Sequence, residues 1–109
     1  GARPFGVSIL FGGVDEDSTP KLFATEPSGI FFQYKAIAVG EGEVEATDIL
    51  TKNFKETLTI DEGIKLAITI FKKVLGKDFD IERLSTAQVK IEDKAYKKIS
   101  INHLKKLSK

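Results

Sequence analysis

The chain contains no cysteine, which excludes several chemistries before any motif is considered. A disulfide framework, a thiolate nucleophile and a thiolate metal site are all impossible without it. Histidine occurs once, at His103, so a second imidazole is missing that could complete a transition-metal site or a catalytic dyad. We therefore expect His103 to be a surface residue near the end of a lysine-rich helix.

An excess of charge and long apolar runs are also lacking. The 17 basic and 16 acidic side chains leave a formal net charge of +1, which gives no field to attract nucleic acid or an anionic membrane. Apolar runs fall far short of the roughly 20 residues of a membrane-spanning helix, and no leader pattern precedes Arg3. We expect a soluble intracellular protein of one small domain, since 41% of its 109 residues are hydrophobic.

The first forty residues have the two-residue period of β-strands. Apolar side chains alternate over residues 5–14, a polar turn follows at 15–20, and a short strand at 21–25 completes a hairpin. A second turn at 27–29 leads into a third strand at 30–39. These strands carry apolar side chains on both faces, and such surfaces need a covering layer or a partner.

At Gly40 the period changes to that of helices. A first helix is predicted over residues 43–56, with acidic residues near its start, where the helix dipole favours anions. Thr59 and Glu62 have the spacing of a capping box and predict the start of a second helix, which Gly76 ends. Its wide apolar stripe comprises Ile60, Ile64, Ala67, Ile68, Phe71, Val74 and Leu75.

The last thirty residues indicate a second hairpin and a short helix. Ala87, Val89 and Ile91 alternate as in a strand, a turn follows at 93–94, and a partner strand is predicted at 96–99. Ser100 can cap a final helix that contains Leu104 and Leu107. The element order βββ-αα-ββ-α predicts an α+β fold with antiparallel sheets.

Two stretches resemble ligand-binding loops. Gly40-Glu41-Gly42 suggests a phosphate loop, but Glu45 stands at the third glycine position, and the carboxylates of Glu41, Glu43 and Glu45 would repel phosphate. We interpret it as a strand-to-helix turn.

Asp15, Glu16 and Asp17 suggest a calcium loop, but Pro20 stands where such a loop needs glycine. A solvated turn is the better interpretation. The remaining candidates are basic residues near the end of the chain, which have only Tyr96 as an aromatic neighbour and are interpreted as a solvated face: Lys97, Lys98, Lys105, Lys106 and Lys109.

Three ordered blocks resemble the proteasome α-type subunits. "RPFGVSILFGGVDE", "PKLFATEPSG" and "YKAIAVGEG" are similar to the family's RPFGV strand, its PxLF strand ending in D/E-P-S-G, and its YKAxAIGxG strand. "TLTIDEGIKLAITIFKKVL" resembles the family's fourth helix, and "RLSTAQVKIEDKAYKKISINHLKKL" resembles its closing strands and last helix. Glu41 departs from the small residue usual in that turn, which weakens any expectation of close packing there.

The resemblance implies that residues 1–109 are the C-terminal portion of an α-type subunit domain, part of a four-layer αββα N-terminal-nucleophile hydrolase sandwich. It implies a non-catalytic role in the outer ring of the 20S core, which gates substrate entry for ubiquitin- or ATPase-dependent degradation. No catalytic, cofactor-binding or metal residue is implied here. The implied partners are the other α subunits of a seven-membered ring, β subunits, and regulatory ATPase or activator complexes, without nucleic acid or membrane.

The implied location is cytoplasmic, and also nuclear if the source is eukaryotic. On its own, the chain is expected to self-associate through apolar strand surfaces or open strand edges, with Phe31, Ile37 and Val39 as the first side chains to inspect. Two alternatives remain open. A catalytic β-type threonine peptidase fragment would share the fold, but such subunits carry a GSGS turn and an Asp-x-x-Ser-Gly-Gly stretch, where this chain has "GEGE" and "DIERLSTAQV". The other alternative is an unrelated interaction module.

Overall fold

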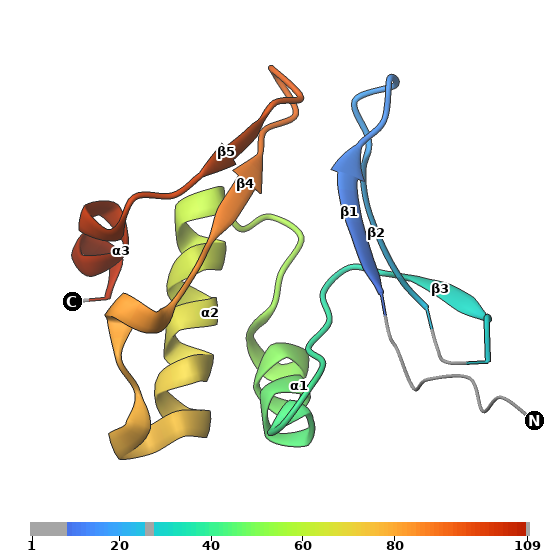
Figure 1. The fold of residues 1–109 in the computed structure, drawn as a ribbon. Helices are drawn as coiled ribbons and strands as arrows, with labels where there is room; N and C mark the ends of the chain where they lie inside the picture. The colour runs from blue at the N-terminus through green and yellow to red at the C-terminus, as the bar shows by residue number, and fades with distance from the viewer. Residues whose placement is uncertain (1–8, 26–27, 109) are drawn as a thin grey trace, which may run out of the picture. The chain divides into compact units, whose positions relative to one another are not determined.

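The computed structural model of the chain describes residues 9–25 and 28–108. Along the chain the elements are β1 (Leu10–Val14), β2 (Pro20–Thr25), β3 (Phe31–Tyr34), α1 (Glu43–Asn53), α2 (Ile60–Leu75), β4 (Ala87–Val89), β5 (Tyr96–Lys98) and α3 (Ile101–Leu107) (Figure 1). Two short 3-10 turns, η1 (Gly76–Asp78) and η2 (Ile81–Arg83), join α2 to β4. The predicted order βββ-αα-ββ-α is confirmed.

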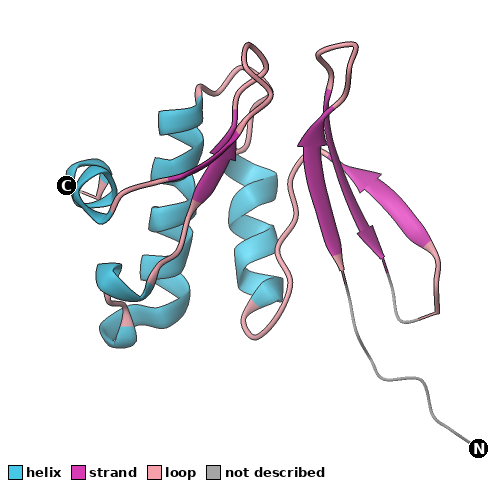
Figure 2. Ribbon diagram, turned by 45° about the horizontal axis from the view of Figure 1, so that its top comes forward, coloured by secondary structure: helices cyan, strands magenta, loops and turns pink. Residues whose placement is uncertain are grey.

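The described chain divides into two compact units. One unit comprises the residues up to Lys35 together with Val89–Ala95, and the other comprises Ala36–Gln88 and the residues from Tyr96 onward. The first unit contains an antiparallel sheet in the order β1-β2-β3 (Figure 2). A turn joins β1 to β2, in which the Asp15 amide donates to the Thr19 carbonyl at 3.0 Å.

The third strand is shorter than predicted. The alternating residues 30–39 predicted one long strand, but β3 ends at Tyr34. In this register Leu22 and Ala24 of β2 lie opposite Tyr34 and Phe32, so in a longer β3 Pro20 would lie opposite Ala36. Proline has no amide hydrogen to donate, so the ladder stops there. The prediction of a strand through Val39 was therefore wrong.

The structure tests the predicted first strand, residues 5–14, only over the residues that it describes. β1 is found over Leu10–Val14, whereas Phe5 and Val7 of the predicted strand lie outside the described residues. Of the predicted turn at 27–29, the part that is described contains Gly29 with φ 91°, a conformation that favours glycine.

In the second unit, α2 lies between α1 and α3 (Figures 1 and 2). Its predicted start and end are confirmed. The Thr59 hydroxyl accepts the Glu62 amide at 3.2 Å, and the Glu62 carboxylate accepts the Thr59 amide at 3.0 Å, which completes the capping box. Gly76 follows the last helical residue with φ 54°.

The apolar core of this unit forms where α2 meets α3. Its buried members are Ile64, Ile68, Ile99 and Leu104, with Phe79, Ile81, Leu84 and Leu107 packed around them. Leu104 is only 1% exposed. α3 is also held at both ends, because His103 Nε2 lies 3.0 Å from Asp61 Oδ1 and Lys72 Nζ donates to the Ser108 carbonyl at 2.6 Å. The predicted cap is confirmed, since the Ser100 hydroxyl accepts the His103 amide.

The remaining element ends differ by a few residues. The first helix was predicted to reach Glu56 but ends at Asn53, whose side-chain amide donates to the Ile49 carbonyl while Phe54 turns to an extended conformation. Ile91 lies beyond β4, and the predicted turn at 93–94 is confirmed by Lys94 with φ 52°. β5 ends at Lys98, although the Ile99 amide still donates to the Thr86 carbonyl.

Candidate interaction surface

Both faces of the three-stranded sheet carry exposed apolar side chains. On one face Leu10, Ala24 and Phe32 align across the strands, and Phe32 is 48% exposed although its ring meets that of Tyr34 edge-on at 6.4 Å. On the opposite face Phe11 is 54% exposed, next to the half-buried Phe23. The prediction that these strands are apolar on both sides is confirmed. Contiguous exposed apolar surface of this kind marks an interface.

The sequence analysis named Phe31, Ile37 and Val39 as the first side chains to inspect on this surface, and the structure places them differently. Val39 is exposed and Ile37 is half-buried, in a segment that follows β3 and is not strand. The Phe31 side chain lies outside what the structure describes. Exposed apolar surface is therefore centred on β1 and β3 themselves, including Ile9 and Ile30 beside them.

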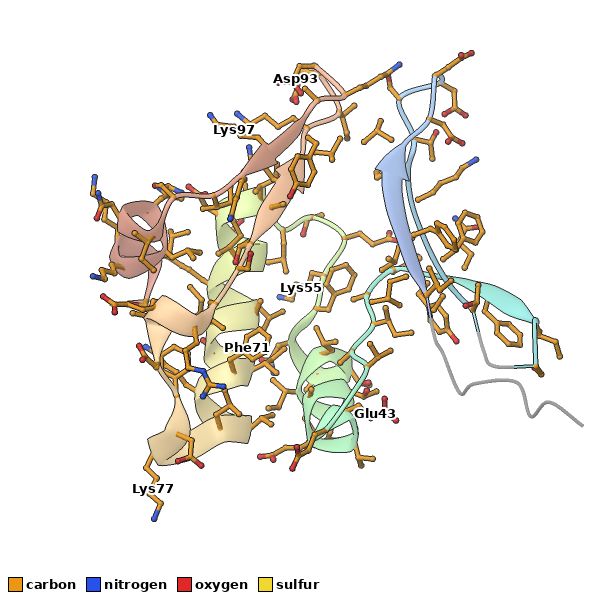
Figure 3. The ribbon with its side chains drawn as sticks, in the orientation of Figure 1. Glu43, Lys55, Phe71, Lys77, Asp93 and Lys97 are labelled. Carbon is orange, nitrogen blue, oxygen red and sulfur yellow. The ribbon has the colours of Figure 1, made fainter. Side chains whose placement is uncertain are left out.

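A second exposed apolar surface runs along the length of α2. Its exposed residues are Ile60, Ala67, Phe71 and Leu75, of which Figure 3 labels Phe71. All four belong to the wide apolar stripe predicted for this helix. The buried or touching residues lie on either side of them: Ile64 and Ile68 face α3, whereas Ile70 is buried on the same side as Val74, which touches the start of α1. α2 packs along two flanks and leaves the centre of its wide apolar arc uncovered.

The Gly40-Glu41-Gly42 stretch is a turn that leads into α1, as interpreted from the sequence, but residues 35–39 before it are not strand. Gly40 and Gly42 have φ of 107° and 81°. The Gly42 carbonyl accepts the first hydrogen bond of α1, which the Ala46 amide donates. The Glu43 carboxylate, in the first turn of α1, accepts the Gly40 amide at 3.2 Å and so closes the turn before the helix (Figure 3 labels Glu43). A shallow hollow beside it is lined by Glu43, Glu45 and Asp48 among others, which is unfavourable for phosphate.

Close packing at this turn was missed by the sequence analysis. A Cβ atom added to Gly42 would lie 2.5 Å from Val74 Cγ1, whereas at Gly40 it would meet nothing within 4 Å. The presence of Glu41 had weakened the expectation of tight packing, but Glu41 is exposed and the second glycine makes the contact. The contact joins Gly42 to Val74 on the next helix. No local sequence pattern shows that these two residues meet, because they are far apart in the chain.

Asp15 and Asp17, in the turn between β1 and β2, make contacts with other residues of the same hairpin. Asp15 forms an ion pair with Lys21 at 2.6 Å, and hydrogen bonding to Asp15 raises the pKa of Lys21. Hydrogen bonds from the Thr19 hydroxyl and amide lower the pKa of Asp17. The Glu16 carbonyl accepts Lys94 Nζ at 2.7 Å. These contacts support the interpretation of a hairpin turn. Among the residues that the structure describes, no group of three or more metal-ligating side chains could hold an ion.

His103 and the C-terminal lysines have structural contacts. His103 joins α3 to the start of α2 through Asp61, with side chains 41% and 56% exposed. Lys105 pairs with Glu82 at 3.3 Å, whereas Lys97 and Lys98 are exposed and alternate along β5, so they do not form one basic patch (Figure 3 labels Lys97). Lys109 lies outside the described residues. Across residues 9–25 and 28–108, no helix is both long and apolar enough to cross a membrane.

Comparison with known proteins decides the family. A model of the family described as "Proteasome subunit" matches residues 1–91, which is most of the chain. The chain belongs to the proteasome subunit family. Among its relatives, the proteasome subunit alpha of Methanocaldococcus jannaschii is 39% identical over 107 residues, and that of Metallosphaera sedula is 48% identical over 91 residues. The proteasome subunit alpha of Methanococcus maripaludis is 38% identical over all 109 residues.

These proteasome relatives are considerably longer than the chain. The matches cover 98%, 84% and 100% of the chain but only 40%, 36% and 41% of the three relatives. The predicted resemblance to the C-terminal portion of an α-type subunit is confirmed, together with the α+β class of the N-terminal-nucleophile hydrolase fold. The alternative of an unrelated interaction module was wrong. The relatives named here are all alpha subunits, and none of them favours the β-type alternative.

Proposed function

We propose that residues 1–109 act as the C-terminal portion of a non-catalytic proteasome α-type subunit. The observation that carries this proposal is the match of 98% of the chain to a proteasome subunit alpha at 39% identity. In this role the chain contributes to assembly with other proteasome subunits. α subunits form a seven-membered outer ring that contacts β subunits and regulatory ATPase or activator complexes and gates substrate entry to the core. Its location is the cytoplasm, and also the nucleus in a eukaryotic source.

The exposed apolar surfaces support an assembly role. Phe11 and Phe32 project from opposite faces of one sheet, and Phe71 and Leu75 are exposed on α2. Apolar surface on this scale is costly in water, at about 25 cal/mol per Å². Since the chain spans only about 40% of its longer relatives, the remainder of a subunit supplies layers that cover these faces.

The absence of catalytic activity is part of the same proposal. The chain has no cysteine, and His103 is its single histidine, so neither a thiolate nucleophile nor a pair of imidazoles is available within these residues. The His103 ring contacts Asp61 as part of the attachment of α3 to α2. We expect the purified chain to cleave fluorogenic peptides of hydrophobic, basic and acidic specificity only at the rate of buffer.

Two measurements test the proposal. Peptide cleavage that a threonine-directed covalent inhibitor abolishes would support the β-type alternative instead. For assembly, the chain is co-expressed with the N-terminal part of the Methanocaldococcus jannaschii subunit, whose C-terminal part it matches. We expect the two pieces to co-purify with equal stoichiometry and to lose the dye-binding apolar surface. Pieces that stay separate, while the intact archaeal subunit cut at the same position reassembles, would contradict the proposal.

A further inference from the structure

A hollow of about 720 Å³ lies within the second unit, between the segment that leads into β4 and the segment that leads into α3. Two stretches of the chain that are far apart in sequence line it. Arg83 and Ser85 belong to the first stretch, and Lys98, Ser100 and Ile101 belong to the second. We call it the basic hollow, because its two unpaired charged side chains are both cations.

The polar side chains of the basic hollow offer hydrogen-bond donors to an anion. Within the described residues, neither Arg83 nor Lys98 has an ion-pair partner. The one acidic side chain of the lining, Glu82, already pairs with Lys105 at 3.3 Å. The Ser100 hydroxyl accepts a backbone amide, and a hydroxyl that accepts one hydrogen bond can also donate one. The hollow therefore has an excess of positive charge and of donors.

Apolar side chains form the rest of the lining. Leu104 and Ile99 are buried and belong to the core of this unit, whereas Leu84 is half-buried and Ile101 is exposed. An occupant that matches both parts of the lining has an anionic group beside an apolar one. In a polypeptide, an aspartate or glutamate next to an aliphatic or aromatic residue has this chemistry.

We propose that an acidic segment from the remainder of the longer α-type subunit occupies the basic hollow. Its carboxylate lies between Arg83 and Lys98, and a neighbouring apolar side chain lies against Ile101. This inference rests on the proposed function, in which the chain is one part of a subunit; it spans only 40% of the Methanocaldococcus jannaschii relative.

The cost of covering charge favours a carboxylate over an apolar occupant. A cation that is removed from water without a counter-charge is strongly unfavourable, so a segment that covers Arg83 and Lys98 has to supply an anion. The planar guanidinium of Arg83 can donate two parallel hydrogen bonds to one carboxylate, which also fixes its orientation.

The test uses a full-length chimera in which this chain replaces the matched part of the Methanocaldococcus jannaschii proteasome subunit alpha. Arg83→Gln and Lys98→Gln each remove one cation from the basic hollow. The matched control is Lys97→Gln. Lys97 is exposed on the same strand but does not line the hollow, because successive strand side chains point to opposite faces (Figure 3 labels Lys97).

We expect Arg83→Gln and Lys98→Gln each to lower the urea midpoint of the chimera, because each leaves a covered carboxylate with one partner fewer. The equilibrium constant of unfolding should rise about tenfold or more, as for the loss of a hydrogen bond to a charged group. Lys97→Gln should leave it unchanged. In the unmodified chimera, an amine-reactive reagent should acylate Lys98 more slowly than Lys97, as measured by mass spectrometry.

Other results would overturn the proposal. A higher urea midpoint for Arg83→Gln and Lys98→Gln would mean that an apolar segment covers the cations, since the loss of an unpaired covered charge is stabilising. Unchanged midpoints with equal acylation of Lys97 and Lys98 would mean that nothing covers them. Slow acylation of Lys98 that occurs only in the assembled ring, and not in separated subunits, would assign the carboxylate to a neighbouring subunit.

Failure of this inference is distinguishable from failure of the proposed function. A chimera that folds, as judged by circular dichroism, and gives any of these contrary results would refute only the inference. A chimera that does not fold, while the unmodified archaeal subunit does, would contradict both.

Discussion

Gly42→Ala tests the close contact between the start of α1 and the end of α2. Gly42 has φ 81°, and an L-residue held in the left-handed region loses about 1–2 kcal/mol. Its new Cβ would also lie 2.5 Å from Val74 Cγ1. Val74 is β-branched and helical, so its side chain has essentially one allowed rotamer and cannot easily move away. Overpacking of this kind costs about 1–3 kcal/mol more.

We therefore expect Gly42→Ala to lower the free energy of unfolding by about 2–5 kcal/mol, which is a large part of the roughly 5–15 kcal/mol of a small domain. Urea denaturation followed by far-UV circular dichroism measures it. The matched control is Gly40→Ala, because Gly40 also has positive φ, at 107°, but open space around its Cβ position. The control should show only the backbone cost.

The contact can also be separated from the backbone cost by a double-mutant cycle. In a Val74→Ala background the close methyl group is gone, so Gly42→Ala should cost no more than Gly40→Ala does. Equal costs for Gly42→Ala and Gly40→Ala in the unmodified background would refute the reasoning. So would a full cost of Gly42→Ala that persists after Val74 is truncated.

Other predictions concern the helix ends and the core. Thr59→Ala should cost about 1 kcal/mol by removing the cap of α2, and Thr59→Ser should restore most of it, both read from urea midpoints. Hydrogen bonds with the Thr59 amide and hydroxyl lower the pKa of Glu62. The stability that the Glu62 carboxylate contributes should therefore be complete above the pKa of Glu62 in the unfolded chain, and should be lost as the pH falls through its lowered pKa in the folded chain. A Glu62→Gln variant that loses as much stability between pH 6 and 3 as the unmodified chain would contradict this. Leu104→Ala should cost about 2–5 kcal/mol and detach α3, as seen by hydrogen exchange. His103→Gln should cost less than about 1 kcal/mol, because its pair with Asp61 is largely exposed.

The sequence predicts local structure well where the signal is contained in a few neighbouring residues. The capping box at Thr59 and Glu62, the Ser100 cap and the stop at Gly76 were all found where predicted, because each depends on contacts within one turn. The end of β3 could not be predicted this way. It depends on Pro20, which lies fourteen positions before Tyr34 and becomes relevant only in the paired register.

Packing between helices was predicted only in part. Periodicity identified the apolar arc of α2, but it does not say which sector of a wide arc other elements cover, and Phe71 and Leu75 are exposed. Lys72 donates to the Ser108 carbonyl and lies 5.8 Å from the Phe79 ring centre, and periodicity predicts neither contact. Contacts between residues this far apart in the sequence depend on the assembled fold.

The central claim is that the chain is part of an α-type subunit that assembles into a ring. It is tested most directly by native mass spectrometry of a chimera in which this chain replaces the matched part of the Methanocaldococcus jannaschii proteasome subunit alpha, with the unmodified subunit as control. We predict that the chimera forms a ring with the same number of subunits as the control. A chimera that folds, as judged by circular dichroism, but remains monomeric while the control forms rings would contradict the claim.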